Sequence, residues 1–84
     1  MTEAPTLTIY SKPGCHLCDD MKQLVIRLSQ SLPLRLEEID ISQDPELEAR
    51  YGLEIPVLMV DGRKAAKYRI SDGELRRLLE ARRP

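Results

Sequence analysis

Residues 6–18 read TLTIYSKPGCHLC, and this stretch decides how the chain folds. Residues 6–10 form a short run of β-branched and aromatic side chains, which is typical of a strand. Residues 11–14 follow with the proline and glycine that end regular structure. Because Cys15 and Cys18 come directly after this turn, we expect a first strand that enters a tight loop carrying a Cys-x-x-Cys motif.

A first helix is expected directly after that loop. Apolar residues recur there at helical spacing, at Leu17, Met21, Leu24, Val25 and Leu28. The positions between them are mostly charged or polar, so the helix is expected to be amphipathic and to bury one face. Pro33 closes the segment.

Two further helices carry clear signals at their ends. Asp44 is expected to cap a short helix that has Pro45 at its first position and ends at Gly52. Ser71 and Glu74 have the spacing of a capping box, which predicts the start of a last helix. One face of that helix is expected to be apolar, with Leu75, Leu78 and Leu79.

A second strand is expected over residues 34–40. Its apolar residues change phase between Leu36 and Ile39, so its buried face does not follow from simple alternation. We expect a bend or a bulge at this point.

The remaining strands form a hairpin. Residues 56–60 have the composition of a buried strand, and Asp61-Gly62 is a strong turn signal, so residues 63–68 should return antiparallel. The first two strands need a crossover helix and are expected to be parallel. The order βαβαββα therefore predicts an α/β fold, with a mixed four-stranded sheet flanked by helices, in one domain over residues 1–84.

Composition and charge argue against several classes of function. Thirteen basic and fourteen acidic residues give a net charge of −1, so no nucleic-acid partner is expected. No apolar run approaches the roughly 20 residues of a membrane span, and the first residues do not resemble a signal peptide. We therefore expect a cytoplasmic protein without membrane contact. A cluster of arginines near the end is interpreted as complementing a helix dipole, and it comprises Arg76, Arg77, Arg82 and Arg83.

The cysteine pair carries the candidate chemistry. Helix N-termini favour anions, so Cys15, nearest the helix start, is expected to ionise more readily and to attack a substrate disulfide. Cys18, one turn further on, is close enough to resolve the mixed disulfide. Lys12 precedes Cys15 by three residues and is a candidate to add positive charge beside the thiolate and to hold a substrate carboxylate.

Other interpretations of the motif remain open. A zinc or iron–sulfur site needs about four ligands, and His16 is the only additional soft donor, so a metal carrier would require two chains to pool their cysteines. A structural disulfide is disfavoured in a reducing compartment. A third possibility is a binding module with weak redox activity. His16 itself is interpreted as a spectator.

The run from Ile9 to Cys18, followed by Ile55-Pro56 and the Asp61-Gly62 turn, resembles the glutaredoxin-like members of the thioredoxin superfamily. The likeness covers nearly the whole chain. It implies a thioredoxin-like fold, a cis peptide before Pro56 facing Cys15, and an Ile55 backbone free to pair with a bound peptide or glutathione. By the same resemblance, Lys12 matches the lysine that precedes the family's motif.

The chain also departs from glutaredoxins in ways that bear on its partners. It has His16-Leu17 between the cysteines, and it lacks the late Gly-Gly pair that precedes the glutathione-binding helix start. Only Ser71 and Asp72 stand where they can substitute in that role. The resemblance thus implies a monomer without a resident cofactor or metal that acts on a disulfide-containing protein or on glutathione. Glutathione or a thioredoxin reductase would regenerate it.

Overall fold

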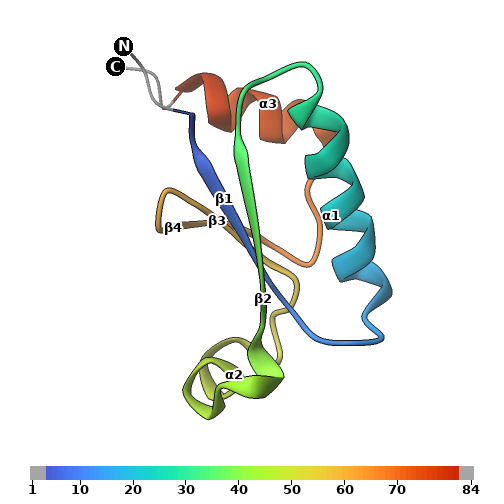
Figure 1. Cartoon of the computed structure of the whole chain (residues 1–84), viewed down its shortest axis with the longest axis vertical. Helices are drawn as coiled ribbons and strands as arrows, with labels where there is room; N and C mark the ends of the chain where they lie inside the picture. Colours follow the sequence, from blue (N-terminus) through green and yellow to red (C-terminus); the bar gives the residue numbers. More distant parts are fainter. Residues whose placement is uncertain (1–3, 82–84) are drawn as a thin grey trace.

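The computed structural model describes residues 4–81, so Arg82 and Arg83 of the predicted basic cluster lie outside the described part. Within residues 4–81 the order of elements is the predicted one, with a short 3-10 helix added before α2 (Figure 1). The elements are β1 (Thr6–Ser11), α1 (His16–Ser29), β2 (Arg35–Asp40), η1 (Ile41–Gln43), α2 (Pro45–Tyr51), β3 (Val57–Val60), β4 (Arg63–Lys67) and α3 (Asp72–Ala81).

The four strands form one mixed sheet in the order β2-β1-β3-β4. The pairing of β1 with β2 is parallel, whereas β1 with β3 and β3 with β4 are antiparallel. The predicted α/β class and the predicted strand directions are therefore confirmed. Because β1 has a partner on both sides, the loop that leaves it starts from the middle of the sheet.

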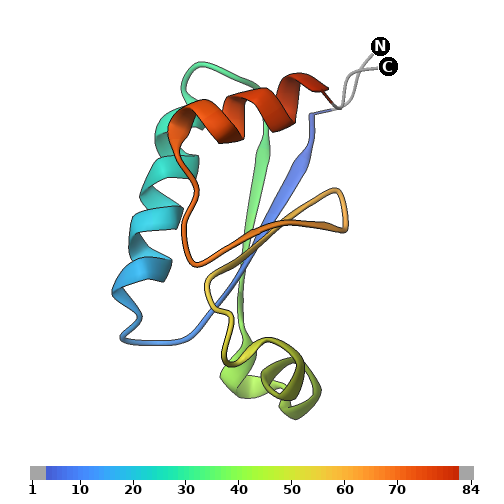
Figure 2. The ribbon, with the colours of Figure 1, turned by 180° about the vertical axis from the view of Figure 1, so that it is seen from behind.

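The core lies between one face of the sheet and helices α1 and α3. Figure 2 shows α1 running beside the strands and α3 crossing the end of the sheet opposite α2. The alternating burial of β1 sends Leu7 and Ile9 into this core, where they meet Leu58 of β3. The helices supply the remaining buried residues, namely Met21, Leu24, Val25, Leu28, Leu75 and Leu79.

The bulge expected in β2 is wrong. β2 pairs with β1 in unbroken register from Thr6↔Arg35 to Ser11↔Asp40. The register shift lies instead between β3 and β4, at Leu58/Met59.

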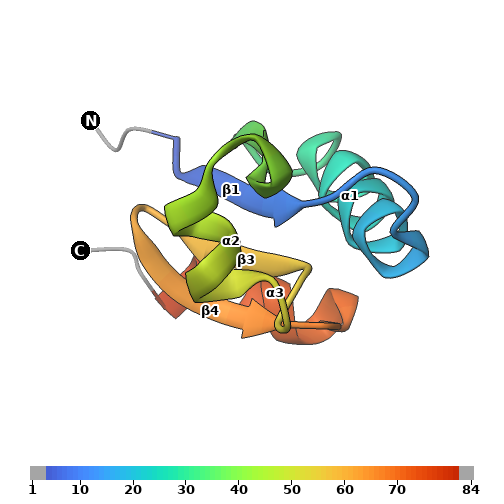
Figure 3. The same cartoon turned by 90° about the horizontal axis from the view of Figure 1, so that it is seen from below.

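The apolar residues of β2 change face along the strand for a different reason. Its two ends are covered by other elements on opposite faces of the sheet. Ile39 pairs with Tyr10, so both lie on the face away from the core helices. Tyr51 of α2 stacks on Tyr10 there, with ring centroids 4.8 Å apart. Figure 3 looks along the sheet from the end that α2 covers. Apolar Ile39 thus follows the face that α2 shields, whereas Leu36 packs against the main core.

Two aspartate caps fix the turn from β2 into α2. The Asp40 carboxylate accepts hydrogen bonds from the Ser42 backbone N–H at 2.9 Å and from the Ser42 hydroxyl at 2.6 Å. Asp44 caps α2 by accepting from Glu46 N–H and Leu47 N–H, as the sequence predicts. The bonds from Ser42, with the hydroxyl first, lower the pKa of Asp40 below its ordinary value.

The core prediction compares two leucines of opposite exposure. Leu58 is 0% exposed and Leu53 is 92% exposed. We expect Leu58→Ala to lower the free energy of unfolding by about 2–5 kcal/mol, because it removes transfer energy and leaves a cavity. The control Leu53→Ala should change it by no more than about 0.5 kcal/mol. Denaturant unfolding of the oxidised protein measures both, and equal effects would contradict the placement of the core.

The second prediction concerns acid titration. Ser42→Ala removes the largest cause of the lowered pKa of Asp40, so this pKa should rise toward its ordinary value while the backbone bond keeps it somewhat lowered. A lowered carboxyl pKa contributes stability above the unfolded-state pKa that is lost as the pH falls through the folded-state pKa. The variant should therefore lose the share of this acid-sensitive stability that the Ser42 hydroxyl provides and keep the share that the backbone bond provides. Carboxyl carbon NMR follows the titration, with Ser29→Ala, whose hydroxyl bonds Ile26, as the control.

Candidate functional site

Cys15 occupies the N-cap position of α1. Its backbone is extended, at φ −91° and ψ 108°, and its Sγ accepts a hydrogen bond from the Cys18 backbone N–H at 3.1 Å. The sulfur thus takes the place of the Ser, Thr or Asp oxygen that ordinarily caps a helix. Gly14, at φ +78°, supplies the left-handed turn that brings the chain into this position. A sulfur at this point lies beside the positive end of the helix, which stabilises a thiolate.

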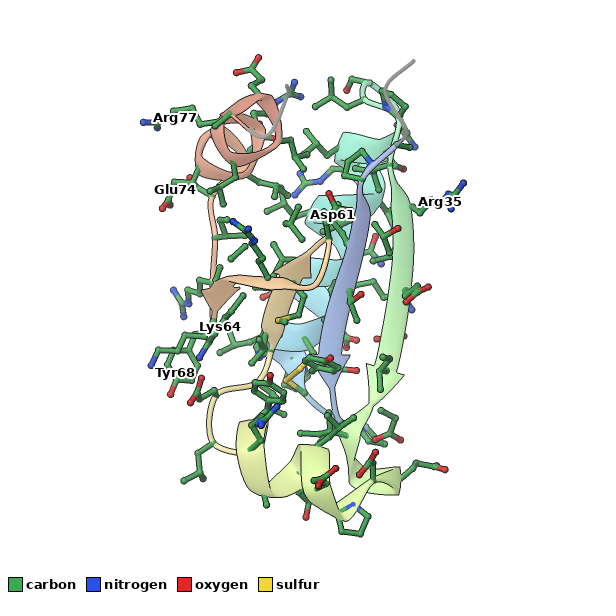
Figure 4. The ribbon with its side chains drawn as sticks, turned by 90° about the vertical axis from the view of Figure 1, so that its left-hand side faces the viewer. Arg35, Asp61, Lys64, Tyr68, Glu74 and Arg77 are labelled. Carbon is green, nitrogen blue, oxygen red and sulfur yellow. A yellow bond between two sulfur atoms is a disulfide. The ribbon has the colours of Figure 1, made fainter. Side chains whose placement is uncertain are left out.

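Cys15 and Cys18 are joined in a disulfide, with their Cα atoms 5.2 Å apart. The yellow bond in Figure 4 marks it among the side chains. Cys18 is 2% exposed and faces the core side of α1, whereas Cys15 is only partly buried. His16, between them, is exposed. The pair is therefore asymmetric, because Cys15 is partly exposed and Cys18 is buried.

The Ile55–Pro56 peptide bond is cis, which confirms the expectation drawn from the family resemblance. β3 begins at the next residue, and Val57 pairs with Tyr10 near the end of β1. The antiparallel register thus brings Pro56 to the same end of the sheet as the cysteine loop. Pro56 is fully buried and Ile55 is partly exposed. We call residues 53–56 the cis-proline loop.

Lys12 extends toward α2. Its Nζ lies 3.1 Å from the Glu48 carboxylate, and both side chains are partly exposed. Lys12 also contributes, as the weakest of the causes, to the lowered pKa of Asp40 at the end of β2. The lysine is thus balanced by acidic groups on neighbouring elements, and its effect on the Cys15 thiolate stays a prediction.

A groove of about 430 Å³ lies between α1, which lines it from Leu17 to Arg27, and the segment that joins β4 to α3. Leu17, between the two cysteines, forms part of one wall, and Asp72 forms part of the other. The structure therefore brings the predicted residue Asp72 next to the cysteine helix. The other lining residues are Asp20, Met21, Leu24, Arg27, Tyr68, Arg69 and Ile70.

Ser71 and Asp72 already have partners within α3. The Ser71 hydroxyl accepts from Glu74 N–H at 3.1 Å, which confirms the predicted capping box. The Asp72 carboxylate accepts from Arg76 Nε at 2.6 Å. The described α3 has no basic residue in its last turn, so Arg76 does not complement the helix dipole there as expected and instead pairs with Asp72 in the first turn. A ligand that used Ser71 or Asp72 would share them with these contacts.

Tyr68 is the residue of this region that sequence reasoning missed. It lies at φ +67°, a left-handed conformation that is uncommon for an aromatic residue. The one available signal is its position in the stretch where glutaredoxins carry Gly-Gly, because glycine is the residue that ordinarily takes such a conformation. A tyrosine in the sequence does not by itself predict a left-handed conformation.

Metal and membrane features can be stated for the described residues. Over residues 4–81, no group of three or more His, Cys, Asp or Glu side chains is placed to hold a metal ion. No helix in this part of the chain has the length and apolar character needed to span a bilayer.

Comparison with known proteins places this chain among glutaredoxin-like sequences. The family model described as Glutaredoxin-like domain (DUF836) matches residues 6–80. An uncharacterized protein of Mycobacterium tuberculosis is 26% identical over 77 residues, which cover 86% of this chain and 79% of that protein. A glutaredoxin-like protein of Dictyostelium discoideum is 28% identical over 75 residues, covering 82% of this chain and 69% of the relative.

Solved structures extend the comparison to the fold. A protein from X. campestris is 31% identical, with a TM-score of 0.78 over 92% of this chain and 99% of that chain. A protein from Nitrosomonas europaea is 26% identical, with a TM-score of 0.82 over 94% and 95%. A thioredoxin from Halobacterium salinarum, 21% identical, shares the fold at a TM-score of 0.66 over 94% and 74%. Its family match, its relatives and its cysteine geometry together make this chain a member of the glutaredoxin-like family within the thioredoxin superfamily.

Proposed function

We propose that this protein is a thiol–disulfide oxidoreductase in which Cys15 attacks and Cys18 resolves. The observation that carries the proposal is the position of Cys15, whose partly exposed sulfur caps α1 and accepts the Cys18 N–H. In the reduced protein the same N–H stabilises the Cys15 thiolate, and the thiolate is the nucleophile of disulfide exchange. The buried Cys18 is protected from direct attack by solvent thiols.

The reaction follows from this arrangement. The Cys15 thiolate attacks one sulfur of a substrate disulfide, forms a mixed disulfide and releases the other substrate sulfur as a thiolate. Cys18 loses its proton and attacks Cys15 Sγ, which releases the second substrate thiol and leaves the Cys15–Cys18 disulfide. Two electrons thereby pass from the protein to the substrate. A dithiol or two molecules of a monothiol must return them before the next turnover.

Substrate binding would use the cis-proline loop beside the cysteines. Ile55 precedes the buried Pro56, and its main chain would pair with an extended segment of a disulfide-containing protein. Lys12 would add positive charge at the same end of the sheet. Because residues 4–81 hold no metal-ligand cluster, a metal carrier would need ligands from a second chain or from outside this part.

The reductant would be glutathione or a thioredoxin reductase, acting on a monomer in the cytoplasm. The groove beside Leu17, with Asp72 on its far wall, is where glutathione would bind. The capping contacts of Ser71 and the ion pair of Asp72 are the local groups with which it would compete. No resident cofactor enters the proposed reaction.

The proposal predicts a two-electron redox transition. We expect the purified protein, equilibrated in graded glutathione buffers and trapped with a thiol-reactive mass tag, to pass between zero and two tagged thiols in one step. Cys18→Ser should trap glutathione or a substrate on Cys15, because the resolving thiol is gone. Cys15→Ser should trap far less, since the remaining sulfur is buried.

Each outcome of this titration is informative. A transition with a glutathione adduct on the Cys18→Ser variant supports a glutathione-linked enzyme. A transition without the adduct favours regeneration by a reductase. If no Cys15–Cys18 disulfide forms at any potential, the oxidoreductase function is refuted, and a purified dimer that retains zinc or a coloured cluster would point to the metal carrier instead.

A further inference from the structure

Tyr68 has an unusual backbone conformation for its position in the fold. Among the described residues other than glycine, only Tyr68 and Asp61 have positive φ, at +67° and +50°. Asp61 lies in the Asp61-Gly62 turn, where hairpin geometry requires such a conformation. Tyr68 follows the end of β4 and is not part of that turn, so its conformation needs another explanation.

The hydrogen bonds of Tyr68 supply that explanation. Its backbone N–H donates to the Pro56 carbonyl at 2.8 Å, and its hydroxyl donates to the Leu53 carbonyl at 2.8 Å. One residue thereby binds the main chain on both sides of the cis Ile55–Pro56 bond. Figure 4 shows the labelled Tyr68 on the same side of the molecule as Lys64.

Apart from the buried Pro56, the residues of the cis-proline loop are exposed or partly exposed. Leu53 is 92% exposed, so its side chain does not anchor the loop in the core. Glu54 donates its N–H to Tyr51 O at 2.8 Å, and its carboxylate forms an exposed ion pair with Lys64. Exposed ion pairs contribute little to stability. The two bonds from Tyr68 therefore hold the loop together with the buried Pro56 and the bond from Glu54 to Tyr51.

Tyr68 also lines the groove along α1. It lines the same groove as Leu17, the residue directly before Cys18. The same residue therefore bonds the cis-proline loop and lines the groove that Leu17 also lines.

We propose that Tyr68 is a positioning residue, which clamps the cis-proline loop so that a docked polypeptide is held in register with Cys15. The inference rests on the proposed function, since it assigns to Tyr68 the alignment of substrate for that exchange. Tyr68 makes both of these bonds, to Pro56 and to Leu53, from a left-handed backbone conformation.

The test compares two variants that each lose one hydroxyl. Tyr68→Phe removes the bond to Leu53 but keeps the backbone bond to Pro56. Tyr51→Phe is the matched control, because the Tyr51 ring stacks on Tyr10 and its hydroxyl has no hydrogen bond among the described residues. Both substitutions are made in the full chain.

The first measurement is amide hydrogen exchange at Glu54, which does not depend on activity. We expect Tyr68→Phe to speed this exchange by about threefold to tenfold, because losing one hydrogen bond lets the loop open more often. Tyr51→Phe should leave the rate unchanged. An unchanged rate in Tyr68→Phe would overturn the proposal.

The second measurement separates docking from sulfur reactivity. For reduction of a peptide that carries one disulfide, Tyr68→Phe should raise KM by about threefold with kcat unchanged. Reaction of reduced Cys15 with dithiobis(nitrobenzoate), a disulfide without a main chain to dock, should keep its wild-type rate. Equal losses with both probes would refute a positioning role, because the hydroxyl would then act on Cys15 itself.

A second pair of variants separates the clamp from backbone strain. Tyr68→Gly relieves the left-handed conformation, whereas Tyr68→Ala keeps it, so the glycine variant should melt at the higher temperature. Both should raise KM for the peptide. A glycine variant with wild-type KM and wild-type Glu54 exchange would contradict the clamp. Wild-type protein inactive toward every disulfide would instead refute the proposed function, and the Glu54 exchange rates would still report on the loop.

Discussion

The double pairing of β1 is the constraint on which the rest of the structure depends. Parallel pairing with β2 and antiparallel pairing with β3 fix the direction and register of the central strand. The chain that leaves β1 reaches Cys15, and the chain that enters β3 passes Pro56. Because the two strands run in opposite directions, one end of the sheet receives both segments. Leu7 and Ile9, both 0% exposed, anchor this arrangement in the core.

The chemistry of the site follows from where α1 begins. A helix start leaves backbone N–H groups without partners, and here the Cys15 sulfur satisfies the N–H of Cys18. In the proposed reaction, the same hydrogen bond that caps the helix also stabilises the attacking Cys15 thiolate. The two cysteines lie one helical turn apart and differ in exposure, because Cys18 faces the core whereas Cys15 is partly exposed. The groove that Leu17 lines and the loop bonded by Tyr68 are the surfaces on which the proposed docking of a partner depends.

Local signals in the sequence predicted most of the fold. The caps at Asp44 and Ser71 and the Asp61-Gly62 turn depend on neighbouring residues, so the sequence alone places them. The face of Ile39 was not predictable in this way, since it is decided by Tyr51 stacking on Tyr10 in another element. The pairing of Lys12 with Glu48 and the positive φ of Tyr68 are likewise products of tertiary packing. The cysteine pair could be identified as the candidate site from sequence because the Cys-x-x-Cys spacing is itself the signal for a redox motif.

The central claim is that helix capping makes Cys15 the reactive thiol. It is tested most directly by alkylating the reduced protein with a limiting amount of iodoacetamide across a range of pH and identifying the modified cysteine by peptide mass. The account predicts that Cys15 reacts at least about tenfold faster than Cys18 near neutral pH, because it is both accessible and favoured as a thiolate. Equal rates at the two cysteines, or faster labelling of Cys18, would contradict it.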